Sequence, residues 1–131
     1  MWRTLSQVAA SACLVLLISV VMPNRAESTP ELHLRLTKSQ PAKDTLLASP
    51  PSEIRLWFSE TPTLALSRVT LSGPGGNIEL GKVTRDPDDS TLLVAKIVPE
   101  LVGGNYSIAW RTASADGHPI RGTLPFSVRP E

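Results

Sequence analysis

Short runs of alternating apolar and polar residues constrain the fold of this 131-residue chain more than any other feature. Clear examples are residues 32–36, 54–59 and 106–111, in which every second side chain is apolar. Such alternation places the apolar side chains on one face of a β-strand. The chain also contains 12 prolines and 8 glycines, which favour many turns over long helices. The pattern therefore predicts an all-β fold.

About seven short strands are expected, and their spacing predicts an antiparallel β-sandwich of about 100 residues with Greek-key connections. The region between residues 43 and 51 is predicted to be a turn-rich connection, and residues 78–83 a weak strand. The side chains predicted to form the core are Leu36, Ile54, Leu56, Phe58, Val69, Leu71, Ile108, Trp110, Phe126 and Val128.

The N-terminal segment has the features of an export signal. Arg3 supplies a positive charge, residues 8–22 form an apolar run, and Ala26 precedes a plausible cleavage point. The run is shorter than the roughly 20 residues that span a bilayer, although an uncleaved anchor is the alternative. We therefore predict a signal peptide at 1–26, a polar lead at 27–32, one folded domain at 33–131 and a periplasmic location, with no membrane span in the mature chain.

Composition excludes several functional classes for the mature chain. Its single cysteine, Cys13, and both methionines, Met1 and Met22, lie within residues 1–26, so disulfides, thiolate metal sites and thiol catalysis are not expected. Removing Arg3 and Arg25 leaves 11 basic against 12 acidic residues, which does not suggest nucleic-acid binding. No nucleophile motif for serine catalysis is present, so the chain is not predicted to be an enzyme.

Residues 114–119 (SADGHP) carry the strongest chemical signal. Asp116 and His118 lie at positions i and i+2, so in extended backbone both side chains point to one side. With His33, the other histidine of the chain, they form a potential imidazole and carboxylate ligand set of the kind that suits Cu(II). The alternative is that Asp116 and His118 merely stabilise a turn. A second acidic group, Asp86, Asp88 and Asp89, is read as a solvated turn rather than a calcium loop.

Several segments together resemble the CopC family of periplasmic copper-resistance proteins. They are residues 33–42 (HLRLTKSQPA), 54–60 (IRLWFSE), 104–111 (GNYSIAWR), 114–119 (SADGHP) and 122–128 (GTLPFSV). The resemblance implies an immunoglobulin-like, cupredoxin-like β-sandwich that binds Cu(II) for sequestration or delivery. It assigns the metal to His33, Asp116 and His118, with Glu60 as a nearby supporting carboxylate. It also implies exchange of copper with an inner-membrane transport protein.

One feature departs from the pattern of high-affinity members, in which the signal is cut immediately before the histidine. Cleavage after Ala26 leaves residues 27–32 ahead of His33, which then has no free amine to chelate the metal. The copper site is therefore expected to be weakened. An exported β-sandwich interaction module with a weakened or lost metal site is the alternative function, and a copper-dependent oxidase is a more remote one.

Overall fold

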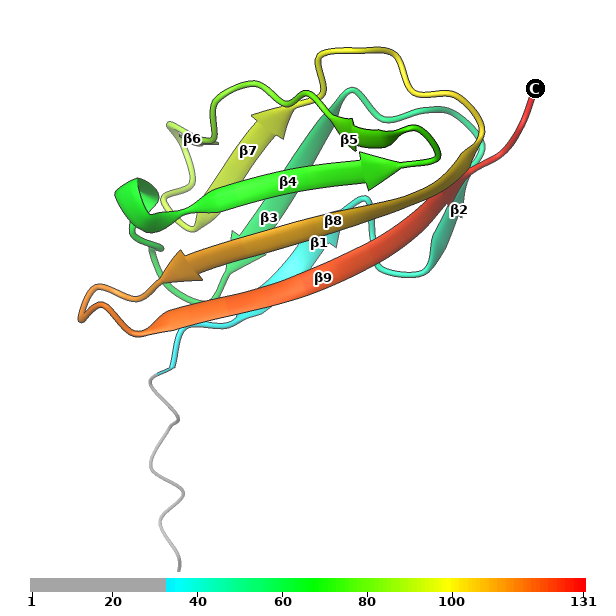
Figure 1. Cartoon of the computed structure of the whole chain (residues 1–131). Helices are drawn as coiled ribbons and strands as arrows, with labels where there is room; N and C mark the ends of the chain where they lie inside the picture. The colour runs from blue at the N-terminus through cyan, green and yellow to red at the C-terminus, as the bar shows by residue number, and fades with distance from the viewer. Residues whose placement is uncertain (1–32) are drawn as a thin grey trace, which may run out of the picture. The chain divides into compact units, whose positions relative to one another are not determined.

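The structure is a computed structural model that describes residues 33–131, so the predicted signal peptide (1–26) and polar lead (27–32) lie outside the described residues. Its elements, shown in Figure 1, are one short 3-10 helix and nine strands: β1 (Leu36–Gln40), β2 (Thr45–Leu47), β3 (Glu53–Phe58), η1 (Leu64–Leu66), β4 (Arg68–Gly73), β5 (Gly76–Ile78), β6 (Thr84–Arg85), β7 (Leu92–Lys96), β8 (Gly104–Ala113) and β9 (Pro119–Val128). Within the described part of the chain, no helix has the length and apolar character to cross a membrane.

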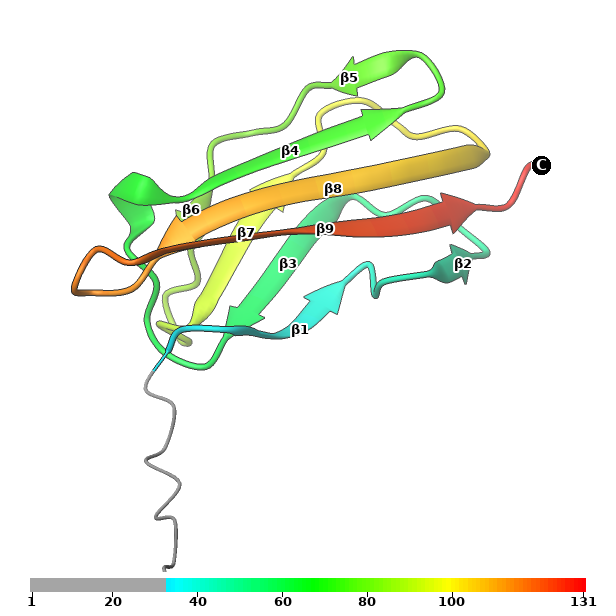
Figure 2. The same ribbon diagram turned by 60° about the horizontal axis from the view of Figure 1, so that its bottom comes forward.

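The strands form two sheets, which confirms the predicted all-β sandwich. One sheet has four strands in the order β1-β3-β7-β6, and the other has five in the order β2-β9-β8-β4-β5. The two views in Figures 1 and 2 show the long β8–β9 hairpin lying across β3 and β7 of the other sheet. Several neighbours are far apart in sequence, as in β3 beside β7 and β4 beside β8, so the chain crosses repeatedly between the layers.

Two details differ from the predicted arrangement. About seven strands were expected, whereas the structure has nine. The weak strand predicted at residues 78–83 does not form, since β5 ends at Ile78 and β6 begins at Thr84. These two strands and β2 are only two or three residues long and show too few alternations to be predicted. The sandwich is also not wholly antiparallel, since β2 pairs with β9 in parallel, from Thr45 opposite Phe126 to Leu47 opposite Val128. After β1 the chain leaves its sheet and runs along the edge of the other one, so β2 lies in the predicted turn-rich connection.

The core lies between the sheets, as the alternation predicts. Of the ten predicted core side chains, eight are buried, and Leu36 and Val69 are partly buried against the same cluster. Phe58 and Trp110, from opposite sheets, pack edge to face with their ring centroids 5.5 Å apart. The predicted set missed buried residues of β7 and of the loops and strand ends, among them Leu34, Leu92, Leu93, Ala95, Ile97, Leu101, Tyr106 and Leu124.

The β8–β9 hairpin positions the predicted metal motif. Its two ten-residue strands are paired along their whole length, from Gly104 opposite Val128 to Ala113 opposite Pro119. The connecting turn is closed by backbone bonds from the Ser114 N–H to the His118 carbonyl oxygen (3.1 Å) and from the Gly117 N–H to the Ser114 carbonyl oxygen (2.9 Å). Gly117 has a φ of 86°, a conformation that other residues rarely adopt. The turn is thus held by the most extensively paired strands of the sandwich.

Candidate metal site

Asp116 and His118 meet on the β8–β9 turn, as their spacing predicts. His118 Nδ1 lies 2.6 Å from Asp116 Oδ2, and both side chains are largely exposed, at 73% for His118 and 65% for Asp116. An imidazole whose Nδ1 donates to a carboxylate presents Nε2 as its metal-binding nitrogen, a common arrangement at metal-bound histidines. The pair therefore offers an oriented imidazole in an accessible position.

Ser114 holds the other side of the Asp116 carboxylate. Its hydroxyl donates to Asp116 Oδ1, and the serine itself is only 8% exposed. The hydrogen bond from Ser114, followed by that from His118, lowers the pKa of the Asp116 carboxyl from 3.8 to about 2. The carboxylate is therefore ionised at any physiological pH, which a metal ligand requires.

His33 and Glu60 lie on two adjacent segments beyond the end of the β1–β3 ladder. The Arg35 N–H donates to Ser59 Oγ (3.0 Å), and the Ser59 N–H donates to the Arg35 carbonyl oxygen (2.8 Å). His33 precedes Arg35 by two residues and Glu60 follows Ser59, and both are exposed. This backbone pairing brings the start of the described chain to the end of β3.

A further connection joins that end of β3 to the β8–β9 turn. The Thr63 N–H donates to the Ala113 carbonyl oxygen (2.9 Å), and Thr63 Oγ1 donates to the Ser114 carbonyl oxygen (3.1 Å). Residues 59–63 thus bridge from the His33 segment to the turn that carries Asp116. Figures 1 and 2 show the start of the coloured chain and the β8–β9 turn at the same end of the sandwich.

The structure brings together only part of the predicted ligand set. Asp116 and His118 are in contact, but within residues 33–131 no three His, Asp or Glu side chains are gathered closely enough to hold a metal ion. His33 and Glu60 share the end of the sandwich with that pair without forming one cluster with it. The donors that are present, an imidazole and an ionised carboxylate, suit a divalent first-row metal.

Sequence reasoning missed Ser114, which had a local signal, and Thr63, which had none. Ser114 precedes Asp116 by two residues, a spacing at which a serine hydroxyl reaches a turn carboxylate. Thr63 has no local signal, because its partners, Ala113 and Ser114, are some fifty residues away.

The second acidic group forms a turn that is capped by its own side chains. Asp86 Oδ1 accepts the N–H groups of Asp88 (2.9 Å) and Asp89 (3.1 Å), and Asp89 Oδ1 accepts both the N–H and the hydroxyl of Thr91. These bonds are those of a capped turn, in keeping with the reading of this segment as a turn.

Comparison with known proteins gives one family. The sequence model of the CopC domain matches residues 36–129 of this chain. Copper resistance protein C of Xanthomonas campestris pv. juglandis is 31% identical over 119 residues, which cover 86% of this chain and 92% of that protein. Protein YobA of Escherichia coli K12 is 32% identical over 98 residues, covering 74% and 79% of the two chains. Copper transport protein CutJ of Bacillus subtilis is 27% identical over 116 residues, 88% of this chain but only 21% of the relative.

The fold agrees with these relationships. The crystal structure of PcoC, a methionine-rich copper resistance protein from Escherichia coli, superposes with a TM-score of 0.67 at 30% sequence identity. The match covers 74% of this chain and 99% of PcoC. The likeness therefore extends over nearly the whole of that protein.

Proposed function

The chain belongs to the CopC family of copper-resistance proteins, and from this premise we propose that it binds Cu(II) at the end of the sandwich that carries the β8–β9 turn. Proteins of this family bind copper and are not enzymes. Copper is accordingly the cargo of the chain rather than a catalytic cofactor, and the proposed role is to sequester or deliver it.

The Asp116–His118 pair is the observation that carries this proposal. Their contact of 2.6 Å orients an exposed imidazole and an ionised carboxylate on a turn held by two long paired strands. We assign His118 as the principal ligand, Asp116 as ligand or orienting partner, and His33 as the second imidazole, which lies at the same end of the sandwich. Glu60 has a supporting role.

The donor types favour Cu(II) over Cu(I). Thioethers and thiolates are the soft ligands that suit Cu(I), and residues 33–131 contain neither methionine nor cysteine. PcoC, by contrast, is described as methionine-rich. The chain has therefore kept the imidazole and carboxylate donors of a cupric site without those of a cuprous one.

The N-terminal sequence and the relatives support a proposal for where the protein acts and which partner it exchanges copper with. We propose that residues 1–26 are a signal peptide and that the protein acts in the periplasm, where the family is typically found. The similarity to part of a copper transport protein, CutJ, supports a membrane copper transporter as the partner that exchanges copper with this domain.

The position of His33 sets the expected affinity. Cleavage after Ala26 leaves six residues before His33, so its backbone nitrogen is an amide and a poor ligand. Each lost factor of ten in affinity corresponds to about 1.4 kcal/mol, so a missing amine ligand weakens the site substantially. Mass spectrometry of the mature N-terminus tests this point, since a mature chain that begins at His33 would restore the amine ligand.

Competition titration with Cu(II) on point variants tests the ligand assignment. We expect His118→Ala to abolish binding, His33→Ala to come close to abolishing it, Asp116→Asn to weaken it, and Glu60→Gln to change it least. The control is a cooperative thermal unfolding transition in every variant, which is expected because all four side chains are exposed. Wild-type Cu(II) affinity in His118→Ala would contradict the proposal.

A second candidate function is an exported interaction module. The observation in its favour is that Asp116 already has both oxygens occupied, by Ser114 and His118, and that no cluster of three ligands forms among residues 33–131. In that case Asp116 and His118 serve only to shape the turn. A protein that binds no Cu(II) in the titration above, yet folds normally, would favour this second function.

A further inference from the structure

Three arginines form a row across the outer face of the five-stranded sheet. In the strand register, Arg68 of β4 lies opposite Arg111 of β8, and Arg111 lies opposite Arg121 of β9. All three side chains are exposed. Adjacent strands are about 4.8 Å apart, so the backbone positions of the three arginines span about 10 Å across the sheet. We call Arg68, Arg111 and Arg121 the arginine row.

The fold does not need this row for its stability. Like charges directly opposite each other in a sheet are destabilising. Strands β4, β8 and β9 contain no acidic residue, and within residues 33–131 none of the three guanidinium groups forms an ion pair or a side-chain hydrogen bond. The charges are therefore uncompensated within the described domain.

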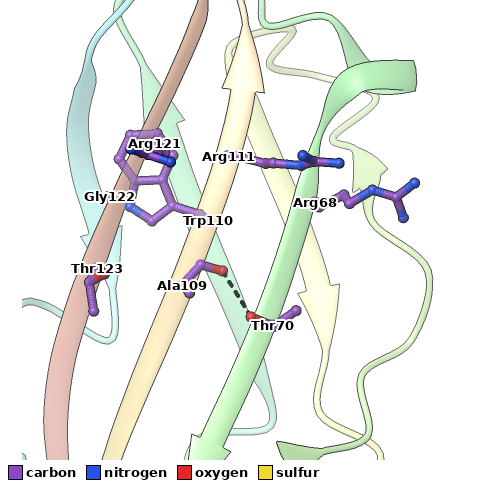
Figure 3. Close-up of a pocket in the computed structure, with 8 residues that line it drawn as sticks. All are labelled: Arg68, Thr70, Ala109, Trp110, Arg111, Arg121, Gly122 and Thr123. Atoms are coloured by element: carbon purple, nitrogen blue, oxygen red, sulfur yellow. Dashed lines mark hydrogen bonds between the residues drawn. The ribbon is translucent and has the colours of Figure 1, made fainter.

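The row lines a hollow in the sheet surface of about 510 Å³. Figure 3 shows the arginines along one side of it, with Thr70, Ala109 and Thr123 in the next row along the same three strands. These small side chains leave room above the strands. Gly122 also lines the hollow, and beneath it lies the indole of Trp110, whose buried Nε1 has no hydrogen-bond partner. Guanidinium groups beside a shallow floor of small residues are suited to receive carboxylates, which arginine binds through paired hydrogen bonds.

The row also adjoins the turn of the candidate metal site. A second, smaller hollow of about 240 Å³ is lined by Arg68 and Arg111 together with Gly117 and Pro119 of the β8–β9 turn. Leu66, 52% exposed, lies at the rim of this hollow. The arginine row is therefore separated from the turn that carries Asp116 and His118 only by this smaller hollow.

We propose that the arginine row is the docking site for an acidic segment of a protein partner. Arginine flanked by an exposed apolar side chain is typical of protein interfaces, and opposite charge steers the encounter. A lipid surface fits less well, because the cations line a hollow and no large apolar side chain among its lining residues is exposed for insertion. The docking proposal does not depend on the proposed function, but the idea that this partner exchanges copper does.

The test uses a fluorescein-labelled octapeptide of alternating glutamate and serine, with a glutamine-for-glutamate peptide as its control. Binding to protein purified from cells expressing the full-length chain is followed by fluorescence anisotropy. We expect binding of the glutamate peptide that weakens as salt is raised, and a loss of affinity of about tenfold or more in the triple variant Arg68→Gln, Arg111→Gln, Arg121→Gln.

The matched control is the triple variant Lys43→Gln, Lys96→Gln, Arg129→Gln. It lowers the net charge by the same three units at exposed positions outside the row, and it should bind the glutamate peptide as the wild type does. Thermal unfolding checks that both triple variants fold.

Three outcomes would overturn the docking proposal. They are equal losses in the two triple variants, equal binding of the glutamate and glutamine peptides, and arginine-dependent binding to phosphatidylglycerol vesicles without peptide binding. A Cu(II) titration of the wild type separates this proposal from the copper one. A wild type that binds copper but not the peptide removes only the docking proposal. Peptide binding without copper binding in the wild type keeps the docking and removes the copper function.

Discussion

A single methyl group added at Gly122 should disturb the packing of the core against the β8–β9 hairpin. Gly122 lies opposite Trp110 in the β8–β9 register, and the indole lies against its backbone on the core side of the sheet. A Cβ at this position would lie 2.7 Å from Trp110 Cζ2, 2.8 Å from Cε2 and 3.0 Å from Nε1. These are ring atoms of a side chain only 9% exposed that packs edge to face on Phe58. The indole therefore has little freedom to move away.

The expected cost follows from two opposing effects. Forcing an extra carbon into a packed core costs about 1–3 kcal/mol. Replacing glycine by alanine restricts the unfolded chain and returns about 0.4–1 kcal/mol. We therefore expect Gly122→Ala to lower the free energy of unfolding by about 1–2 kcal/mol. For a domain of this size that corresponds to a decrease in Tm of about 5–15 °C.

Thermal unfolding followed by far-UV circular dichroism measures this change without relying on tryptophan emission. Gly75→Ala is the matched control, because a Cβ there meets nothing within 4 Å and its φ is not positive. It should leave Tm unchanged or raise it slightly. A Gly122→Ala protein as stable as Gly75→Ala would refute the packing argument.

Three further predictions concern the turn, the core and the metal. The low pKa of Asp116 means that its interactions stabilise the fold above about pH 4 and are lost as the pH falls from 3.8 towards 2. Ser114→Ala should raise the pKa of Asp116 towards 3.8 in a carboxyl NMR titration, and an unchanged pKa would contradict the assigned cause. Tyr106→Phe removes a 2.6 Å hydrogen bond from the tyrosine hydroxyl to the Val102 carbonyl oxygen. It should lower the free energy of unfolding by about 1 kcal/mol in urea denaturation, and an unchanged urea midpoint would show that this bond contributes nothing. Competition with a cuprous chelator should show Cu(I) binding much weaker than Cu(II) binding, and equal or tighter Cu(I) binding would show that the ligand set is misassigned.

The alternation of apolar side chains was enough to predict the fold class. Ile54, Leu56 and Phe58 alternate on one strand, and each is buried between the sheets. The same rule failed for β2, because three residues show too little periodicity and its parallel partner lies about eighty residues away. Such pairings depend on how distant segments pack together in the folded chain rather than on any local pattern.

The same difference between local and long-range contacts decides which parts of the candidate site could be predicted. Contact between Asp116 and His118 follows from their i and i+2 spacing, which is local and was predicted. The placing of His33 depends on the Arg35–Ser59 and Thr63–Ala113 pairings, which join distant segments. The arginine row could not be predicted either, because it exists only once the register sets Arg68, Arg111 and Arg121 opposite one another. Sequence therefore predicts neighbours along a strand far better than neighbours across a sheet.

The central claim is that both histidines bind one Cu(II) ion. Pulsed EPR of the Cu(II)-loaded protein tests it most directly, because the remote nitrogen of each coordinated imidazole modulates the echo and combination lines mark two of them. The account predicts two coordinated imidazoles in the wild type, one in His33→Ala, and no imidazole-bound copper in His118→Ala. A wild-type spectrum with no imidazole modulation, or one that His118→Ala leaves unchanged, would contradict it.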